Sequence, residues 1–259
     1  MTCALAGPRA VLMQIAHPLV AAGVAEHSRY RTARFGRLYR TALAAAAITF
    51  CSEDLATRAI RSIDGKHRQV HGVLSKPAGI FPAGTHYNAN DPELKLWVLA
   101  TITDSTLLAY ELFVRPLSMT EREEFYQDSL LLTQLFAIPE RIVPPAYRDF
   151  QAYMKNMLSG GTIQVSEAAR DISNALFAPT LAGKAMYAGS IAGIGMLPDR
   201  LKAEFGLPWS PRRERWLNSG ASIHRSVRKH VPSIFCASPV ATFSELVAGF
   251  DRQFAALHR

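Results

Sequence analysis

Apolar residues recur at helical spacing along almost the whole chain, and this pattern constrains the fold more than any other feature. Period-two alternation bounded by turn residues, which is typical of a half-buried strand, is nearly absent. The chain has 259 residues, 49% of them hydrophobic, and can therefore bury a substantial core. Neither a repeat of fixed period nor a low-complexity linker interrupts the pattern. The sequence predicts an all-α fold, with residues 1–259 forming a single helical domain.

Caps and prolines predict where the individual helices begin and end. Asp91-Pro92-Glu93 combines an N-cap, a first-turn proline and a first-turn acid, and so predicts the start of a long helix. Thr120 and Glu123 have the spacing of a capping box for the next helix. Residues 182–196 are rich in Gly and Ala and fit either a tightly packed helix or an irregular buried segment. Further helices are expected over residues 8–17, 18–28, 33–50, 52–74, 145–158, 166–177 and 242–258, with another starting at Ser210-Pro211.

The distribution of charge bears on the partners of the chain. The net charge is +8, and residues 9–76 hold eleven Lys and Arg against four Asp and Glu. Such a basic region attracts anions, and a carboxylated cofactor would explain it as well as a nucleic acid would. No glycine-rich basic tract, aromatic-interleaved strand or zinc-finger spacing accompanies the charge, so we expect no nucleic-acid partner. Nothing in the sequence indicates an oligomeric state.

Apolar segments and cysteines bear on the location of the chain. The best candidate for a membrane span, residues 10–25, is interrupted by Gln14, His17 and Pro18, whereas a span needs about 20 predominantly apolar residues. We therefore expect no transmembrane segment. The cysteines at positions 3, 51 and 236 are odd in number and have no paired spacing, which favours the reducing cytoplasm.

Two histidines four residues apart, His67 and His71, lie near the end of the helix expected over residues 52–74. On a helix both side chains would face the same way, as a zinc motif or a haem-binding helix requires. The intervening residues contain no acid that could serve a zinc hydrolase as base or third ligand. His71 precedes Gly72, whose missing side chain would let a flat macrocycle approach, whereas His67 has a basic residue on either side and is expected to face solvent. A hydrogen-bonded histidine at a helix end is the alternative interpretation of His71.

A cluster of polar residues lies on one face of the helix expected over residues 33–50. Arg37, Arg40 and Thr41 are spaced i, i+3, i+4, which places two guanidinium groups and a hydroxyl together. The cluster could clamp carboxylates, or it could stabilise negative charge that develops on dioxygen above an open iron face. A solvated arginine face is the alternative interpretation.

Three further polar residues lie in otherwise apolar helices. His17 is a candidate for a direct role at a cofactor, although buried histidines usually satisfy only a hydrogen bond, and Glu26 is a candidate for proton transfer. Asp104 is expected to be a buried carboxylate that pairs with an arginine or orients a histidine. A Gly-x-Ser-x-Gly elbow, a phosphate-binding glycine loop followed by Lys, and a Cys-x-x-Cys motif are all absent.

Five motifs in the first half of the chain occur together in one known family. They are GPRAVLMQIAHP at 7–18, GRLYRT at 36–41, VHGV at 70–73, DPEL at 91–94 followed by Trp97-Val98, and DSTLLAYE at 104–111. These motifs resemble the DUF2236 family, which includes the fungal MpaB-type oxygenases and the bacterial latex-clearing protein, a rubber oxygenase. The resemblance runs from about residue 7 to at least residue 170.

The resemblance implies an all-helical fold with a globin-like core, a b-type haem and oxygen-dependent oxidation or cleavage of an organic substrate. In the rubber-cleaving members an arginine, a lysine three residues later and a threonine precede the proximal histidine. Arg37, Arg40 and Thr41, followed by His71, have that order and separation, so the resemblance favours His71 over His67 as the iron ligand. Arg40 departs from the pattern because arginine stays protonated and is a poor metal ligand. We therefore expect a five-coordinate or water-bound iron and a substrate other than rubber.

The expected function is that of a haem b-dependent oxygenase or oxidase acting on a small hydrophobic organic substrate with dioxygen. One alternative is a helical haem- or ligand-binding protein without turnover, a carrier or sensor, which would bind haem without consuming oxygen. A helical nucleic-acid binder is another alternative, and it predicts salt-sensitive DNA association and no chromophore. For the oxygenase, the expected iron ligand is His71, the other expected cofactor contacts are Gly72, Arg37 and His17, and the catalytic candidates are Arg37, Arg40, Thr41 and Glu26.

Overall fold

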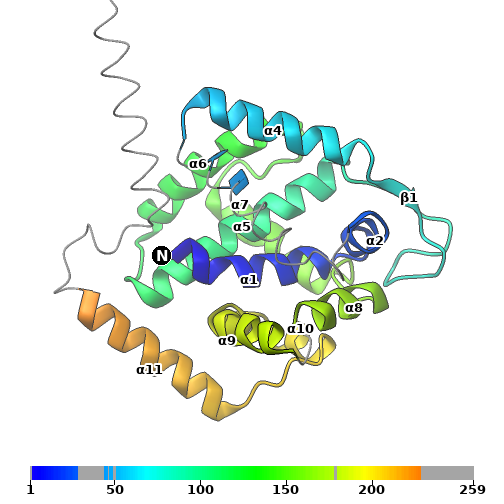
Figure 1. Cartoon of the computed structure of the whole chain (residues 1–259). Helices are drawn as coiled ribbons and strands as arrows, with labels where there is room; N and C mark the ends of the chain where they lie inside the picture. The colour runs from blue at the N-terminus through cyan, green and yellow to red at the C-terminus, as the bar shows by residue number, and fades with distance from the viewer. Residues whose placement is uncertain (1, 29–43, 46, 49–50, 178–179, 229–259) are drawn as a thin grey trace, which may run out of the picture.

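The computed structural model describes residues 2–28, 44–45, 47–48, 51–177 and 180–228. Helices dominate these residues, and the strands form one short antiparallel pair (Figure 1). The predicted all-α fold is confirmed. The elements are α1 (Thr2–Ile15), α2 (Pro18–His27), α4 (Glu53–His67), β1 (His71–Val73), β2 (His86–Asn88), α5 (Pro92–Phe113), α6 (Met119–Leu135), the 3-10 helix η1 (Glu140–Ile142), α7 (Tyr147–Ser159), α8 (Glu167–Leu176), α9 (Leu181–Gly195), α10 (Asp199–Glu204) and α11 (Pro211–Arg228).

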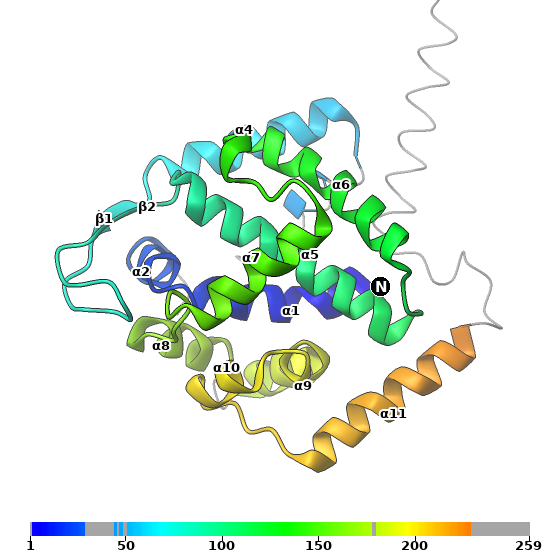
Figure 2. The same ribbon diagram turned by 180° about the vertical axis from the view of Figure 1, so that it is seen from behind.

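Helices α1 and α5 form the central pair of the fold (Figure 1). The indole of Trp97 on α5 is fully buried, and its Nε1 donates a 3.2 Å hydrogen bond to the carbonyl oxygen of Met13 on α1. This bond satisfies the one polar atom of the indole at the centre of the core. Helix α9 also packs on α1, and α6 packs on α5 (Figure 2). The apolar faces of these helices therefore meet in a common core, as their sequence spacing predicts.

An ion pair joins α1 to α5. The guanidinium group of Arg9 is buried, and its Nη1 lies 2.6 Å from Oδ2 of Asp104 and 2.7 Å from Oγ of Ser105. Its Nε donates a 2.9 Å hydrogen bond to the carbonyl oxygen of Met196, just after α9. These acceptors offset the cost of removing the charge from water. The prediction that Asp104 pairs with an arginine is confirmed, although its carboxylate is only partly buried.

Helices α1 and α9 approach most closely at Gly193. A Cβ atom there would lie 2.8 Å from Cβ of Pro8 and 2.8 Å from the backbone nitrogen of Arg9. Glycine lets the two backbones approach without displacing either helix. Of the two alternatives for residues 182–196, the tightly packed helix is correct, because α9 spans Leu181–Gly195.

Several predicted helix ends are wrong. α1 begins at Thr2, and Pro8 lies inside it, where it costs the helix one backbone hydrogen bond instead of opening it. The helix expected over residues 52–74 ends at His67, because the chain turns there and enters β1 at His71. The helix predicted over residues 33–50 lies largely outside the described residues, and the one over 242–258 lies wholly outside them.

The N-cap of α5 agrees with the sequence prediction, and the N-cap of α6 does not. Asp91 caps α5 as predicted, because its side chain accepts a 2.8 Å hydrogen bond from the backbone nitrogen of Glu93. The capping box of α6 is formed by Ser118 and Glu121, so the predicted box of Thr120 and Glu123 is wrong and lies two residues too far along the chain. Glu121 is the third residue of the helix, and its side chain accepts a hydrogen bond from the backbone nitrogen of the cap residue Ser118.

One described helix, α5, is long and apolar enough to cross a membrane by length and composition. Of its apolar window, 56% is buried inside the fold. The core helix of a globular domain passes the same test, and α5 is the core helix here. Its length and composition alone do not make it a membrane span.

Candidate functional site

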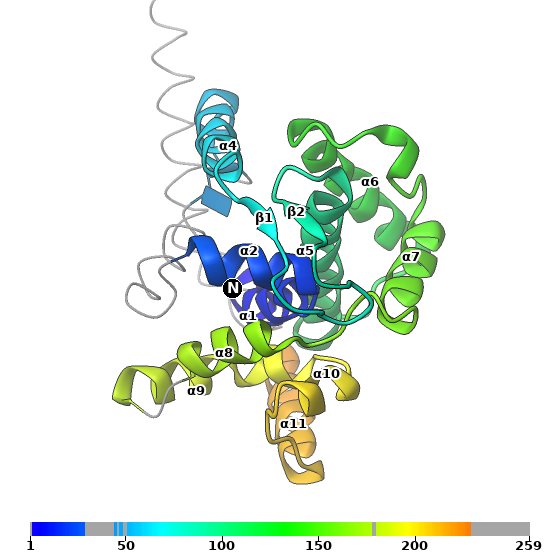
Figure 3. The same ribbon diagram turned by 90° about the vertical axis from the view of Figure 1, so that its right-hand side faces the viewer.

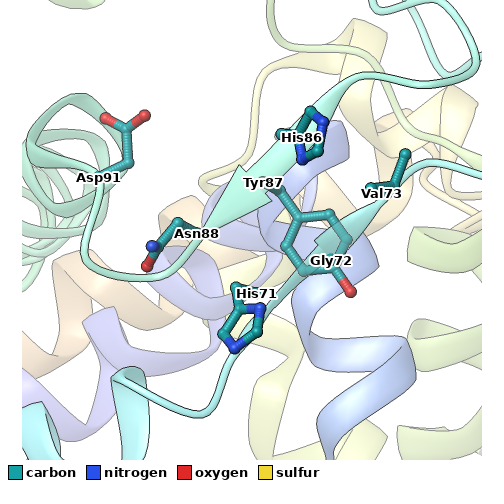
Figure 4. A pocket seen from close by; sticks show the side chains of 7 residues that line it. All are labelled: His71, Gly72, Val73, His86, Tyr87, Asn88 and Asp91. Atoms are coloured by element: carbon teal, nitrogen blue, oxygen red, sulfur yellow. The ribbon is translucent and has the colours of Figure 1, made fainter.

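A groove of about 520 Å³ lies where the β1–β2 hairpin meets the start of α5 (Figure 4). Small-molecule sites typically enclose roughly 300–1,000 Å³. The hairpin connects the end of α4 to the start of α5 and lies on the side of the fold that faces the viewer in Figure 3. Its lining residues are His71, Gly72, Val73, His86, Tyr87, Asn88 and Asp91, most of them exposed.

Tyr87 crosses the hairpin and lies against Gly72 (Figure 4). The strand register pairs these two residues directly. A Cβ atom on Gly72 would lie 2.5 Å from the Tyr87 hydroxyl oxygen and 2.8 Å from its Cζ atom, so the ring needs a glycine opposite it. The space beside Gly72 is therefore filled by the tyrosine in this structure. The approach of a macrocycle at Gly72 stays a prediction.

The Tyr87 hydroxyl connects the hairpin to the end of α2. It donates a 2.5 Å hydrogen bond to Oε2 of Glu26 and lies 3.3 Å from Nε2 of His27. The same Nε2 lies 3.1 Å from the carbonyl oxygen of His71 and must carry the proton there, since a carbonyl only accepts. Burial raises the pKa of Tyr87 above its ordinary value, and the hydrogen bond to Glu26 and the Glu26 charge raise it further. The phenol is therefore held in its protonated, donating form.

His71 is a groove residue that could serve as a ligand to the iron of a cofactor. Such a ligand needs an imidazole nitrogen that is free of other partners and faces open space. Within the described ranges the imidazole of His71 forms no hydrogen bond or ion pair, and it is exposed and lines the groove. Its backbone is fixed by pairing with Asn88 and by the contact of its carbonyl with His27. His86 also lines the groove on a paired strand, and its imidazole has no partner among the described residues, so the preference for His71 rests on the sequence motif.

His67 lies in the last turn of α4 and is not solvent-facing, so that prediction is wrong. The ring is partly buried, and its Nδ1 has no hydrogen-bond partner within the described part of the chain. Burial lowers the pKa of His67, and the nearby Lys95 lowers it further. Because α4 ends at this residue, His67 and His71 do not share a helical face, and the spacing argument for a zinc motif fails.

His17 has a structural role. It is the N-cap of α2, and its Nδ1 accepts a 3.2 Å hydrogen bond from the backbone nitrogen of Leu19. Its buried ring lies 5.5 Å from the ring of Phe81, measured between centroids. Burial lowers the pKa of His17 to about 4, although the charge of Asp91 opposes this shift. A direct contact between His17 and a cofactor stays a prediction.

The structure brings Glu26, His71 and Gly72 to one place, and the other predicted residues are elsewhere or outside it. Arg37, Arg40 and Thr41 lie outside the described residues, so their grouping with His71 stays a prediction. Sequence reasoning missed the two residues that join Glu26 to His71, which are His27 and Tyr87. β2 has only three residues, too few for alternation to mark it as a strand that buries Tyr87.

Comparisons with known proteins agree with the family motifs. The family described as ER-bound oxygenase mpaB/B'/rubber oxygenase, catalytic domain, matches residues 1–228. Two relatives are the uncharacterized proteins Rv2237 of Mycobacterium tuberculosis and Mb2261 of Mycobacterium bovis. Each is 29% identical over 229 residues, which cover 86% of this chain and 87% of the relative. No solved structure matches the chain. The chain belongs to the family of MpaB-type and rubber oxygenase catalytic domains.

Proposed function

We propose that this chain is a haem b-dependent oxygenase that oxidises a small hydrophobic organic substrate, with His71 as the protein ligand to the iron. The observation that carries the proposal is the free imidazole of His71 in the groove, on a backbone fixed by β2 and His27. Family membership supports the oxygenase class, and the imidazole of His71 is a suitable ligand for a haem iron. A cytoplasmic location, inferred from the cysteines, belongs to the same proposal.

Haem, when bound, would supply the activation of dioxygen, and the chain would supply ligation, orientation and proton handling. Glu26 accepts the hydrogen bond from the Tyr87 hydroxyl at Oε2, which leaves its Oε1 as a second acceptor. We propose that this carboxylate accepts and returns a proton during the reaction, with Tyr87 fixing its orientation. Arg37, Arg40 and Thr41 would contribute cationic and hydroxyl donors toward negative charge, as their helical spacing predicts.

The second candidate function is a haem carrier or sensor without turnover. The openness of the groove favours it, since most lining side chains are exposed and an oxygenase ordinarily excludes water from its reacting centre. The two functions differ in whether oxygen is consumed, not in whether haem binds.

Oxygen uptake by the haem-loaded protein separates the two functions. The full chain, produced with haem supplementation, is mixed with a panel of unsaturated lipids and isoprenoid hydrocarbons in an oxygen-electrode cell. We expect uptake with at least one substrate, and oxygen atoms in its product by mass spectrometry. His71→Ala is the inactive control, and His86→Ala, which removes another imidazole from the same groove, is the matched variant that keeps activity. Bound haem without uptake on any substrate would favour the carrier.

A further inference from the structure

Helix α11 has an inner face that is fully used in the fold. Leu217 and Ala221 are buried where α11 packs on α5 and α9. Glu214, the one acid of the helix, accepts a 2.6 Å hydrogen bond from Nε1 of Trp209, and Nδ1 of His224 lies 2.7 Å from the carbonyl oxygen of Phe113. The inner face therefore holds α11 against the fold, and the one acid of the helix takes part in that contact.

The opposite face of α11 carries a stripe of large apolar side chains that is left exposed. Trp216 is 71% exposed, Ile223 64% and Val227 54%. Their spacing of i, i+7 and i+11 places them on one side of the helix. Helix α11 lies at the edge of the molecule, away from α4 and the hairpin (Figures 1 and 2). Three large apolar side chains exposed along one side of a helix are typical of an interaction surface.

Two arginines lie beside the stripe. Arg212 and Arg215 line, together with Trp216 and Ser219, a groove of about 440 Å³. In the part of the chain that the structure describes, neither guanidinium group forms an ion pair or a hydrogen bond. Arg213, by contrast, turns inward and donates a 2.9 Å hydrogen bond to the Tyr187 hydroxyl. The outer arginines are therefore available for an anionic partner.

We propose that the outer face of α11 docks on the surface of an anionic lipid bilayer. An interfacial helix needs an apolar stripe that enters the acyl boundary and cationic residues that meet the lipid phosphates. Trp216 is suited to this boundary because its ring is apolar and its N–H is polar. The stripe and the arginines together define what we call the α11 docking face: Arg212, Arg215, Trp216, Ser219, Ile223 and Val227.

Other partners fit this face less well. A nucleic acid would pair with Arg212 and Arg215 but would leave the stripe from Trp216 to Val227 in water. A second copy of the chain, related by a two-fold axis, would bring the same unpaired arginines against each other. A bilayer surface is the partner that covers the apolar stripe and neutralises the charge at once. This inference does not depend on the haem proposal.

The test is cosedimentation of the full chain with vesicles. Vesicles of phosphatidylcholine alone are compared with vesicles that contain one third phosphatidylglycerol, at low and at high salt. We expect binding to the anionic vesicles, weakened by salt, and a shift of Trp216 emission to shorter wavelength that is lost in Trp216→Phe. Each arginine near an anionic surface contributes roughly fivefold in affinity, so Arg212→Gln with Arg215→Gln should weaken binding about 25-fold.

Matched variants test whether vesicle binding depends on the α11 docking face or on any exposed arginine or apolar residue. Arg148→Gln on α7 and Leu131→Asn on α6 remove an exposed arginine and an exposed leucine elsewhere, and both should bind vesicles as the unchanged chain does. Ile223→Asn should weaken binding without changing the thermal unfolding midpoint, because its side chain is exposed. Equal binding to both kinds of vesicle, equal effects of the matched variants, or binding of a DNA duplex in place of vesicles would overturn the proposal.

Discussion

The hydroxyl of Tyr87 donates a hydrogen bond to Glu26 across 2.5 Å, and this contact joins the β1–β2 hairpin to the end of α2. Tyr87 is buried, whereas Glu26 is exposed, so the bond orients a surface carboxylate from a fixed ring. The backbone of His71 is joined to the same end of α2 through His27. The position of the proposed iron ligand therefore depends on the junction between the hairpin and α2.

Removing the Tyr87 hydroxyl tests this junction. A hydrogen bond to a charged group contributes about 1.5–3 kcal/mol, and we expect Tyr87→Phe to lower the free energy of unfolding by that amount in urea titration. Tyr153→Phe is the matched control, because within the described residues the Tyr153 hydroxyl has no hydrogen-bond partner; it should change stability by less than about 0.5 kcal/mol. Equal effects of the two substitutions would show that the contact with Glu26 does not stabilise the fold.

A methyl group at position 72 tests the packing of the hairpin. In Gly72→Ala the new Cβ would meet the Tyr87 ring, so the ring must move and lose its bond to Glu26. We expect a loss of about 2–3 kcal/mol in urea titration. Gly65→Ala on α4 is the control, since a Cβ there meets nothing within 4 Å, and it should be neutral or stabilising by up to about 1 kcal/mol. A Gly72→Ala protein as stable as Gly65→Ala would contradict the placement of Tyr87.

Two glycines of α9 test the close approach of α1. Gly193→Ala places a methyl group 2.8 Å from the Pro8 side chain, and overpacking of this kind costs about 1–3 kcal/mol. Gly189→Ala lies on the same helix, where a Cβ meets nothing within 4 Å, and should be neutral or slightly stabilising. Thermal unfolding of both variants measures the difference. A lower midpoint for Gly189→Ala than for Gly193→Ala would reverse the assignment of the packed face.

Because His17 is buried with a lowered pKa, we expect the free energy of unfolding to fall in acid. Its folded-state pKa of about 4 lies below its ordinary value of 6.5, so the unfolded chain binds the proton more tightly. The contribution is fully present above pH 6.5 and is lost as the pH falls toward 4, by roughly 3 kcal/mol in total. His17→Asn keeps a capping side chain without a titrating ring, so urea titrations at pH 7 and pH 4 should differ less for it. The same acid loss in both proteins would contradict a buried neutral imidazole.

The sequence predicts some helix boundaries of this chain and not others. Asp91 caps α5 as expected, and the helix expected from residue 166 begins at Glu167, because a local hydrogen bond to the side chain of Asp91 or Ser166 fixes each of these starts. The sequence does not predict the end of α4, since apolar spacing continues past His67. The turn into β1 depends on pairing with β2, whose residues lie 13 to 17 positions later than their partners. That the chain forms a single domain, with a globin-like core, stays a prediction.

The candidate site was predicted less completely than the fold. Glu26, His71 and Gly72 were identified and lie together, but their connection through Tyr87 and His27 depends on contacts between segments about 60 residues apart, which no local pattern contains. The role of His17 as an N-cap was also missed, because histidine is not among the usual capping residues.

The visible absorption spectrum tests the central claim most directly. The full chain, His71→Ala and His67→Ala are produced with haem supplementation and compared at equal protein concentration, with haemin added to any colourless sample. The account predicts a Soret band in the unchanged chain and in His67→Ala, and its loss in His71→Ala alone. A Soret band that survives in His71→Ala, or no band in any sample after haemin is added, would contradict it.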